Sequence, residues 1–252
     1  MNCGIIQARM GSSRLPGKVM KTIGGMPLIG LMVSRLEKSL LLDKIVVATS
    51  ADSSDDVLCG YLDKASIEYF RGSNTDVMHR MLQAAEKHGA ETIIRMTADC
   101  PLIDPSIVDY CISKYHNVQG LDYVGSTSLS DYYPRGQDAC VFSIDTLREV
   151  DGLLMSDSHF REHVSLYIYG AVEAKYRCES IGKPDFDIDK NIRLTVDYDE
   201  DLVVVGKIVE SLGNYCSLHE VVRFLSENNG LLDINRDLVK TEYENNRTRH
   251  GG

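Results

Sequence analysis

The first segment whose residue types suit chemistry is a basic stretch near the N-terminus, QARMGSSRLPGKVM, residues 7–20. It places Arg9, Arg14 and Lys18 among glycine, serine and proline, in a chain whose formal net charge is -10. Small residues let backbone N–H groups approach phosphate oxygens closely, and the three cations supply the opposite charge. The stretch therefore predicts a binding site for a small polyanion.

Two common phosphate-binding motifs do not fit this stretch. A Walker A loop would need Gly-Lys-Ser/Thr after a four-residue gap, and the dinucleotide fingerprint would need G-x-G-x-x-G. Neither pattern occurs here, which disfavours kinases and dinucleotide-dependent enzymes. The alternative to a polyanion site is a basic surface loop in which the glycine makes a turn.

Composition narrows the class of protein further. The chain has 252 residues and 43% hydrophobic residues, enough for one large α/β domain with a substantial core. The acidic balance argues against nucleic-acid binding, and no apolar run has the length of a membrane span. The seven cysteines form no C-x-x-C pair, and the N-terminus lacks the features of a signal peptide. These features predict a cytoplasmic protein.

Short apolar runs alternate with segments of helical period over the first 116 residues. The predicted strands are 3–8, 44–50, 67–70 and 92–98, and the predicted helices are 27–39, 54–66, 75–89 and 104–116. This order is typical of an α/β fold with a mostly parallel sheet flanked by helices. A loop after the first strand then lies at the edge of the sheet where ligands bind.

The remainder of the chain departs from this alternation. Three further strands are predicted at 121–127, 138–144 and 176–181, with a helix at 160–170. We interpret residues 120–190 as a smaller mixed α/β extension that carries substrate or dimer contacts. A strand at 192–197, helices at 199–211 and 218–228, and a polar tail at 233–252 follow. No domain boundary is evident, so residues 1–252 are expected to form a single domain.

Several motifs, quoted in chain order, carry a family resemblance: IIQARMGSSRLPGKVM, VATS, FRGSNTDVMHR, RMTADCPLIDP, YPRGQD, REHV and RLTVDYDEDL. Over residues 3–205 the chain resembles the sugar-acid cytidylyltransferases, and within them the spore coat polysaccharide biosynthesis protein F group. The resemblance implies a Rossmann-like nucleotidyltransferase fold, CTP as substrate, Mg²⁺ as cofactor and a homodimer. It also implies catalytic roles for Arg14 and Lys18 in the basic loop.

Two aspartates stand where predicted strands end. Asp99 follows residues 92–98, and Asp197 closes residues 192–197. Magnesium is typically held by one or two carboxylates together with phosphates and water, and in the related enzymes these two motif positions hold the metal. We therefore expect Asp99 and Asp197 to be catalytic metal ligands. The alternative is that both only cap the helices that follow them, as Asp often does.

The resemblance, the positions of residues at predicted strand ends and the chemistry of the side chains together give the expected binding residues. Nucleotide contacts are expected at Ala8, Arg9, Met10, Gly11, Ser12, Arg14, Lys18, Arg71, Gly72, Ser73, Thr97 and Ala98. Acceptor contacts are expected at Arg135, Asp138, Arg161 and His163. Thr97-Ala98-Asp99 stands where better known members have Gln-Gly-Asp, so the acceptor stays open.

The predicted activity is transfer of CMP from CTP to a sugar acid or related acceptor, with release of pyrophosphate, for surface glycan synthesis. Three alternatives stay open at this point: nucleotidyl transfer with another NTP or a non-sugar acceptor such as a phosphonate, a nucleotide-sugar-dependent glycosyltransferase, and a non-catalytic nucleotide sensor. The glycosyltransferase hypothesis depends on the Asp-x-Asp pattern in DFDID, residues 185–189.

Overall fold

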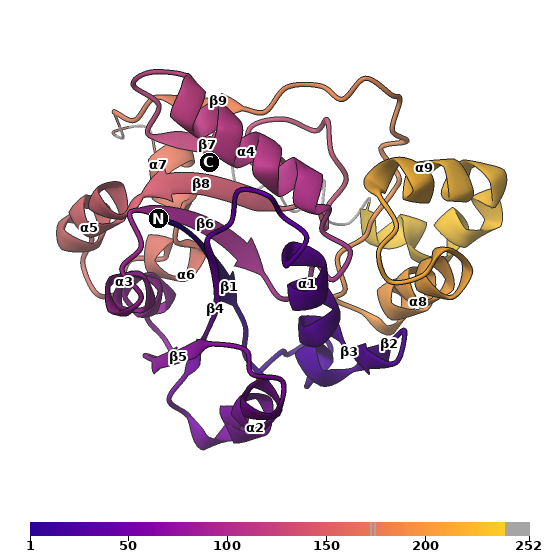
Figure 1. Ribbon diagram of the computed structural model, residues 1–252, viewed down its shortest axis with the longest axis horizontal. Helices are drawn as coiled ribbons and strands as arrows, with labels where there is room; N and C mark the ends of the chain where they lie inside the picture. The colour runs from indigo at the N-terminus through magenta and orange to yellow at the C-terminus, as the bar shows by residue number, and fades with distance from the viewer. Residues whose placement is uncertain (172, 174, 240–252) are drawn as a thin grey trace.

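A seven-stranded sheet with helices on both faces organises the computed structural model of the protein (Figure 1). The structure describes residues 1–171, 173 and 175–239. The strand order is β5-β4-β1-β6-β8-β7-β9. Only β8 runs antiparallel to its neighbours; every other pairing in this sheet is parallel. The predicted Rossmann-like architecture is confirmed.

The first half of the chain supplies the parallel strands and their crossover helices. The strands are β1 Asn2–Gln7, β4 Lys44–Ser50, β5 Tyr69–Gly72 and β6 Thr92–Thr97. The helices are α1 Leu28–Leu36, α2 Asp56–Lys64, α3 Val77–Lys87 and α4 Pro105–Asn117. Asp76 and Asp104 cap α3 and α4 by accepting hydrogen bonds from backbone N–H groups.

The chain order of these strands creates a crevice at one edge of the sheet. From β1 the chain moves outward to β4 and β5, then returns to β6 on the other side of β1. Ligands of open α/β sheets bind at such a switch point, outside the carboxyl ends of the strands. The loops that follow β1 and β6 therefore flank the expected site.

Residues 120–190 extend this sheet. The strands β7 Tyr123–Gly125, β8 Ala139–Ser143 and β9 Cys178–Ser180 lie within the predicted ranges, and α5 Ile144–Leu153 follows β8. The helix predicted at 160–170 is instead two short helices, α6 Phe160–His163 and α7 Leu166–Gly170. Val164 interrupts them with a φ of 42°, a left-handed conformation that helices exclude.

The strand predicted at 192–197 is wrong. This segment is extended and its apolar residues are buried, but its only ladder contact among the described residues is an isolated bridge between Arg193 and Arg135. Leu194 N donates to Arg135 O at 2.7 Å, and Val196 N donates to Asp99 O at 2.8 Å. All six residues of this segment are buried, so its strand-like apolar pattern reflects packing beside two loops rather than pairing in the sheet.

The basic loop contains short elements that its sequence does not predict. A 3-10 turn, η1 Lys18–Met20, precedes a small hairpin of β2 Thr22–Ile23 and β3 Met26–Pro27. Gly17 enters the turn with a φ of 68°, a conformation that glycine adopts without strain. This turn directs Lys18 back toward the edge of the sheet.

The C-terminal part contains α8 Asp199–Leu212, α9 Leu218–Glu227 and a turn, η3 Asn229–Leu231. Residues 232–239 are also helical, and Asn235 is buried, so the polar tail predicted from 233 begins later than expected. The rest of the predicted polar tail, residues 240–252, lies outside the described residues.

Two apolar cores cover the sheet. One packs α1, α4, α8 and α9 on one face, and the other packs α3, α5 and α7 on the opposite face. None of the described helices combines the length and apolar character needed to span a membrane.

Candidate active site

The loop after β1 is anchored at both ends. Ala8 N donates to Ala48 O, and Gly17 N donates to Met10 O at 3.0 Å. Leu15 is buried in the core. A Cβ at Gly11 would meet nothing within 4 Å, so packing inside the protein does not require glycine there. The loop is fixed by its ends, and space is open around its middle.

Asp55 supports this loop and was not predicted from the sequence. Its buried carboxylate accepts from Met10 N at 2.7 Å, from Thr49 Oγ1, and from both Ser50 N and Oγ. Burial alone would raise the pKa of Asp55, but these donors outweigh burial and lower it. An ionised Asp55 therefore ties the basic loop to the end of β4.

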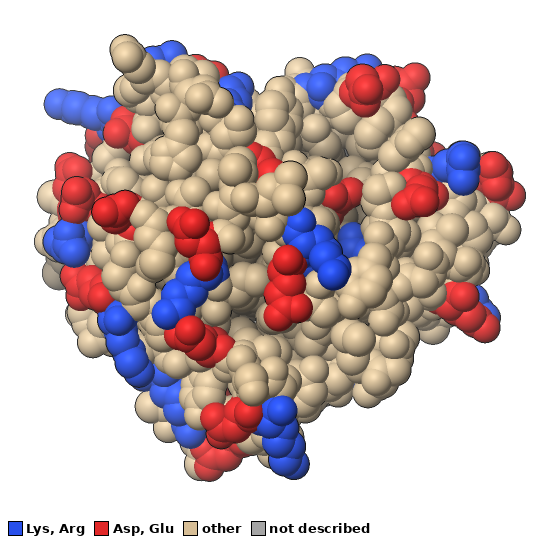
Figure 2. Space-filling model, in the orientation of Figure 1, with Lys and Arg blue, Asp and Glu red and all other residues tan. Residues whose placement is uncertain are grey.

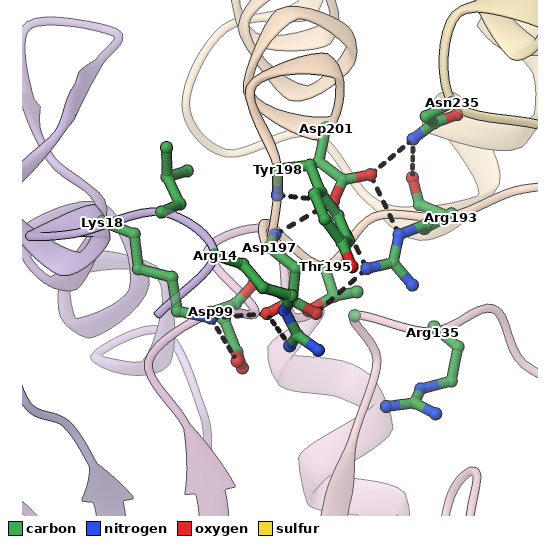
Figure 3. A network of polar contacts seen from close by, with 12 residues as sticks. Arg14, Lys18, Asp99, Arg135, Arg193, Thr195, Asp197, Tyr198, Asp201 and Asn235 are labelled. Atoms are coloured by element: carbon green, nitrogen blue, oxygen red, sulfur yellow. Dashed lines mark hydrogen bonds and ion pairs between the residues drawn. The ribbon is translucent and has the colours of Figure 1, made fainter. Parts of the chain in front are cut away.

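Four of the predicted catalytic residues meet at the edge of the sheet (Figure 3). Lys18 Nζ lies 2.8 Å from Asp99 Oδ2 and 2.7 Å from Asp197 Oδ1. Arg14 Nη2 lies 2.7 Å from the same oxygen of Asp197, and its guanidinium also lies over the Tyr198 ring. The basic loop and the two aspartates thus form one cluster, although they are up to 183 positions apart in the sequence.

The electrostatics of this cluster favour an ionised Asp197 and a charged Lys18. Burial alone would raise the pKa of Asp197, but Lys18 and Arg14 outweigh it and lower the pKa to about 2. Burial alone would lower the pKa of Lys18, and the two carboxylates raise it instead.

Two buried residues that were not predicted as site residues, Arg193 and Asp201, hold the Asp197 carboxylate in place. Arg193 Nη2 lies 3.0 Å from Asp197 Oδ2, and Arg193 Nε lies 2.9 Å from Asp201 Oδ1. Asp201 also accepts from Asp197 N, from Tyr198 N and from Asn235 Nδ2. Asp201 therefore caps the first turn of α8 and also orients Asp197.

The cluster suits a hydrated divalent cation. The Lys18 ammonium lies between Asp99 and Asp197, so the two carboxylates are close enough to contact one positive charge together. In the part of the chain that the structure describes, no group of three or more His, Cys, Asp or Glu side chains could hold a metal ion. Two carboxylates completed by phosphate and water oxygens are the usual arrangement for magnesium rather than for zinc.

The predicted nucleotide segment, residues 71–73, covers the end of β5 and lies at the same edge, but its arginine makes contacts within the protein. Arg71 donates to Ser50 O and Asp52 O and forms an ion pair with Asp56 at 2.7 Å. Ser73 Oγ accepts from Asp76 N, which helps to begin α3. Gly72 packs so tightly that a Cβ would lie 2.8 Å from the Cγ of Arg80. This segment presents backbone groups rather than a free Arg71 side chain.

The segment that precedes Asp99 joins β6 to the basic loop. Ala98 is buried, and its N–H donates to Gln7 O at 3.0 Å. Thr97 is half-buried, and its Oγ1 lies 3.5 Å from the Cys100 sulfur. Both predicted residues lie beside the crevice.

The four predicted acceptor residues do not lie together. Arg135 and Asp138 are on one loop, with Arg135 Nε 3.6 Å from Asp138 Oδ1, and Arg135 is near the cluster in Figure 3. Arg161 is buried under α3, where it pairs with Asp76 and Asp151. His163 is exposed at the end of α6. Arg161 is therefore occupied by structural contacts.

Charged side chains of both signs gather around a hollow in the middle of the face seen in Figure 2. By contrast, the Asp-x-Asp pattern of residues 185–189 lies in an exposed segment, where Asp187 pairs with Lys183 at 3.4 Å. Asp189 accepts from Asn191 N in a local turn. Asp99 and Asp197, rather than this pattern, thus pair with Arg14 and Lys18 of the basic loop.

The chain is similar to known proteins in both its sequence and its fold. The chain is 32% identical over 230 residues to the spore coat polysaccharide biosynthesis protein SpsF of Bacillus subtilis, across 89% of this chain and 93% of that protein. It is 31% identical over 112 residues, 43% of each chain, to a 3-deoxy-manno-octulosonate cytidylyltransferase of Geobacter sulfurreducens. The structure of a cytidylyltransferase from Leptospira borgpetersenii superposes with a TM-score of 0.84 at 29% identity, covering 92% of this chain and 96% of that one.

The family model for cytidylyltransferases matches residues 3–169. That range includes the basic loop, Asp99 and, apart from Asn2, the parallel strands β1, β4, β5 and β6. With the clustered site and the match to SpsF over most of the chain, the match shows that this chain belongs to the cytidylyltransferase family.

Proposed function

We propose that the protein transfers CMP from CTP to a sugar acid, with Mg²⁺ as cofactor, for surface polysaccharide synthesis. The observation that carries the proposal is the cluster in which Lys18 links Asp99 to Asp197 at the switch-point crevice. The names of the relatives supply the substrate class, because they include a spore coat polysaccharide protein and 3-deoxy-manno-octulosonate cytidylyltransferases.

The reaction needs positive charge where negative charge develops. An acceptor oxygen attacks the α-phosphorus of CTP, the bond to the β-phosphate breaks, and pyrophosphate leaves. Bound to Asp99 and Asp197, Mg²⁺ would supply electrostatic stabilisation of the transferring phosphate. When Asp99 and Asp197 bind Mg²⁺ in place of these two cations, Arg14 and Lys18 would be available to bind the triphosphate oxygens.

The remaining residues act by positioning. Arg193 and Asp201 hold the Asp197 carboxylate in one orientation, and Asp55 fixes the start of the basic loop through Met10. Arg135, beside the cluster, is the candidate for binding the carboxylate of the acceptor, because a guanidinium can donate two parallel hydrogen bonds.

We further propose that the protein works in the cytoplasm as a homodimer. All seven cysteines are free, which suits a reducing compartment. The dimer is inferred from the family resemblance alone, and sedimentation of the purified protein would test it.

A pyrophosphate-release assay tests the proposed function. The purified protein would be incubated with CTP, Mg²⁺ and, separately, a panel of sugar acids that begins with 3-deoxy-manno-octulosonate. We expect acceptor-dependent release of pyrophosphate and a CMP-linked product. A product formed only from a nucleotide sugar donor would instead support the glycosyltransferase alternative, and binding of CTP without turnover would support a sensor.

A further inference from the structure

A buried arginine lies beneath the loop that joins β5 to α3. Arg80 is in the first turn of α3 and is only 1% exposed. Its Nη1 donates to Ser73 O, and its Nε is buried without a hydrogen-bond partner in the described structure. Because Gly72, the last residue of β5, packs against its Cγ, the side chain lies at the ligand-binding edge of the sheet.

The charges around Arg80 do not neutralise it. Burial lowers the pKa of Arg80, Arg9 lowers it further, and Asp55 and Asp76 act in the opposite direction. No ion pair joins Arg80 to any carboxylate in residues 1–171, 173 and 175–239. Arginine stays protonated in proteins, so a second guanidinium nearby adds repulsion rather than relief.

The two acids near Arg80 are committed to other groups. Asp55 accepts hydrogen bonds from the basic loop and from β4. Asp76 caps α3 through His79 N and pairs with Arg161. A buried cation is costly unless it is paired, so the arrangement is complete only when an oxygen acceptor arrives from outside the chain.

We propose that Arg80 is a nucleotide-binding residue that, with Arg9 nearby, donates hydrogen bonds to an oxygen of CTP. The inference rests on the proposed function. Arg9 lies near the start of the basic loop, whereas Lys18 and Arg14, further along the loop, pair with the aspartates of the cluster. The oxygen belongs either to the pyrimidine carbonyl or to the triphosphate, because both offer the same acceptor chemistry to a guanidinium.

Arg80→Met removes the charge and keeps most of the apolar volume. We expect the dissociation constant for CTP, measured calorimetrically with Mg²⁺, to rise about tenfold to a hundredfold, since a charge-assisted hydrogen bond in a buried site is lost. The melting temperature of the ligand-free protein should stay unchanged or rise, because an unpaired buried charge has been removed. The matched control is Arg148→Met on α5, an exposed arginine paired with Glu86 and Asp145.

Inorganic tripolyphosphate separates the two sources of oxygen. A parallel loss of tripolyphosphate affinity would assign the contact to the phosphates, and unchanged tripolyphosphate affinity would assign it to the base. Wild-type CTP affinity in Arg80→Met, with or without a lower melting temperature, would overturn the proposal. If Arg80→Met does not fold, Arg80→Gln is measured instead, and wild-type CTP affinity there has the same consequence. Failure of the wild-type protein to bind CTP would refute the proposed function itself.

Discussion

Arg193→Met should destabilise the protein more than any surface charge substitution. Arg193 is 1% exposed and contacts two carboxylates, Asp197 and Asp201, which are also buried. Methionine fills a similar volume without charge, so the substitution leaves two buried acids facing an apolar side chain.

The structure sets the expected magnitude. Removing one partner of a buried ion pair typically costs about 3–5 kcal/mol, because the other charge stays buried. Asp201 would keep three donors, from Asn235 Nδ2 at 3.0 Å and from the backbone N–H groups of Asp197 and Tyr198. These hydrogen bonds limit the loss, so we expect the lower end, about 3 kcal/mol of unfolding free energy.

Urea unfolding followed by circular dichroism gives this number. The control is Lys207→Met on α8, whose ammonium pairs with Glu210 at 2.7 Å on the exposed surface. An exposed pair contributes about 0–1 kcal/mol, so this control should remain close to the wild type. If Arg193→Met and Lys207→Met lose the same stability, within about 1 kcal/mol, the argument for a buried orienting layer is refuted.

Two further predictions concern the aspartates themselves. Asp99→Asn and Asp197→Asn should each reduce turnover by about two orders of magnitude or more, the scale of losing one strong electrostatic contact, while Asp187→Asn in the exposed segment should not. Near-wild-type turnover in a folded variant would remove that aspartate from the proposed metal site. Asp197 should also make stability depend on pH, because its pKa is lowered from 3.8 to about 2 in the folded protein. The unfolded chain then binds the proton first, so up to about 2.5 kcal/mol present above pH 4 should be lost as the pH falls toward 2. Unfolding free energies across that range should lose this component in Asp197→Asn, and an unchanged pH profile in that variant would contradict the assignment.

The spacing of apolar residues along the sequence predicted the parallel strands of the first half of the chain well. In β1, β4 and β6 the apolar run and the strand coincide within about two residues, because central parallel strands are buried on both faces. The same signal failed at residues 192–197, where the extended segment is buried throughout but forms, among the described residues, an isolated bridge rather than a ladder with a neighbouring strand. It also missed the interruption at Val164, because a single residue with a positive φ does not change the spacing of the apolar residues around it.

The sequence predicted those site residues that come directly after a predicted strand. Asp99 and the basic loop follow β6 and β1 directly, so their meeting depends only on parallel topology. Arg193 and Asp201 were missed because their role depends on burial and on contacts eight positions apart. One signal could have indicated them: an arginine standing inside an otherwise apolar run, followed by an acid at the third position of a helix.

Selectivity for the base does not depend on the charged cluster. Arg14, Lys18 and a metal bound to the aspartates would bind the triphosphate of any nucleotide equally well. Discrimination must come from groups at the base edge, and a site built to hydrogen-bond one edge rejects others because its polar groups are left unpaired. A pocket that fits a pyrimidine also excludes the larger purines sterically.

The most direct test of the central claim is kcat/KM for pyrophosphate release with each of the four NTPs, measured with Mg²⁺ and the same sugar-acid acceptor. We predict that CTP exceeds ATP and GTP by at least about a hundredfold, and exceeds UTP by a smaller factor. Equal or better use of a purine nucleotide would contradict transfer of CMP as the activity of this protein, and would leave only nucleotidyl transfer in general.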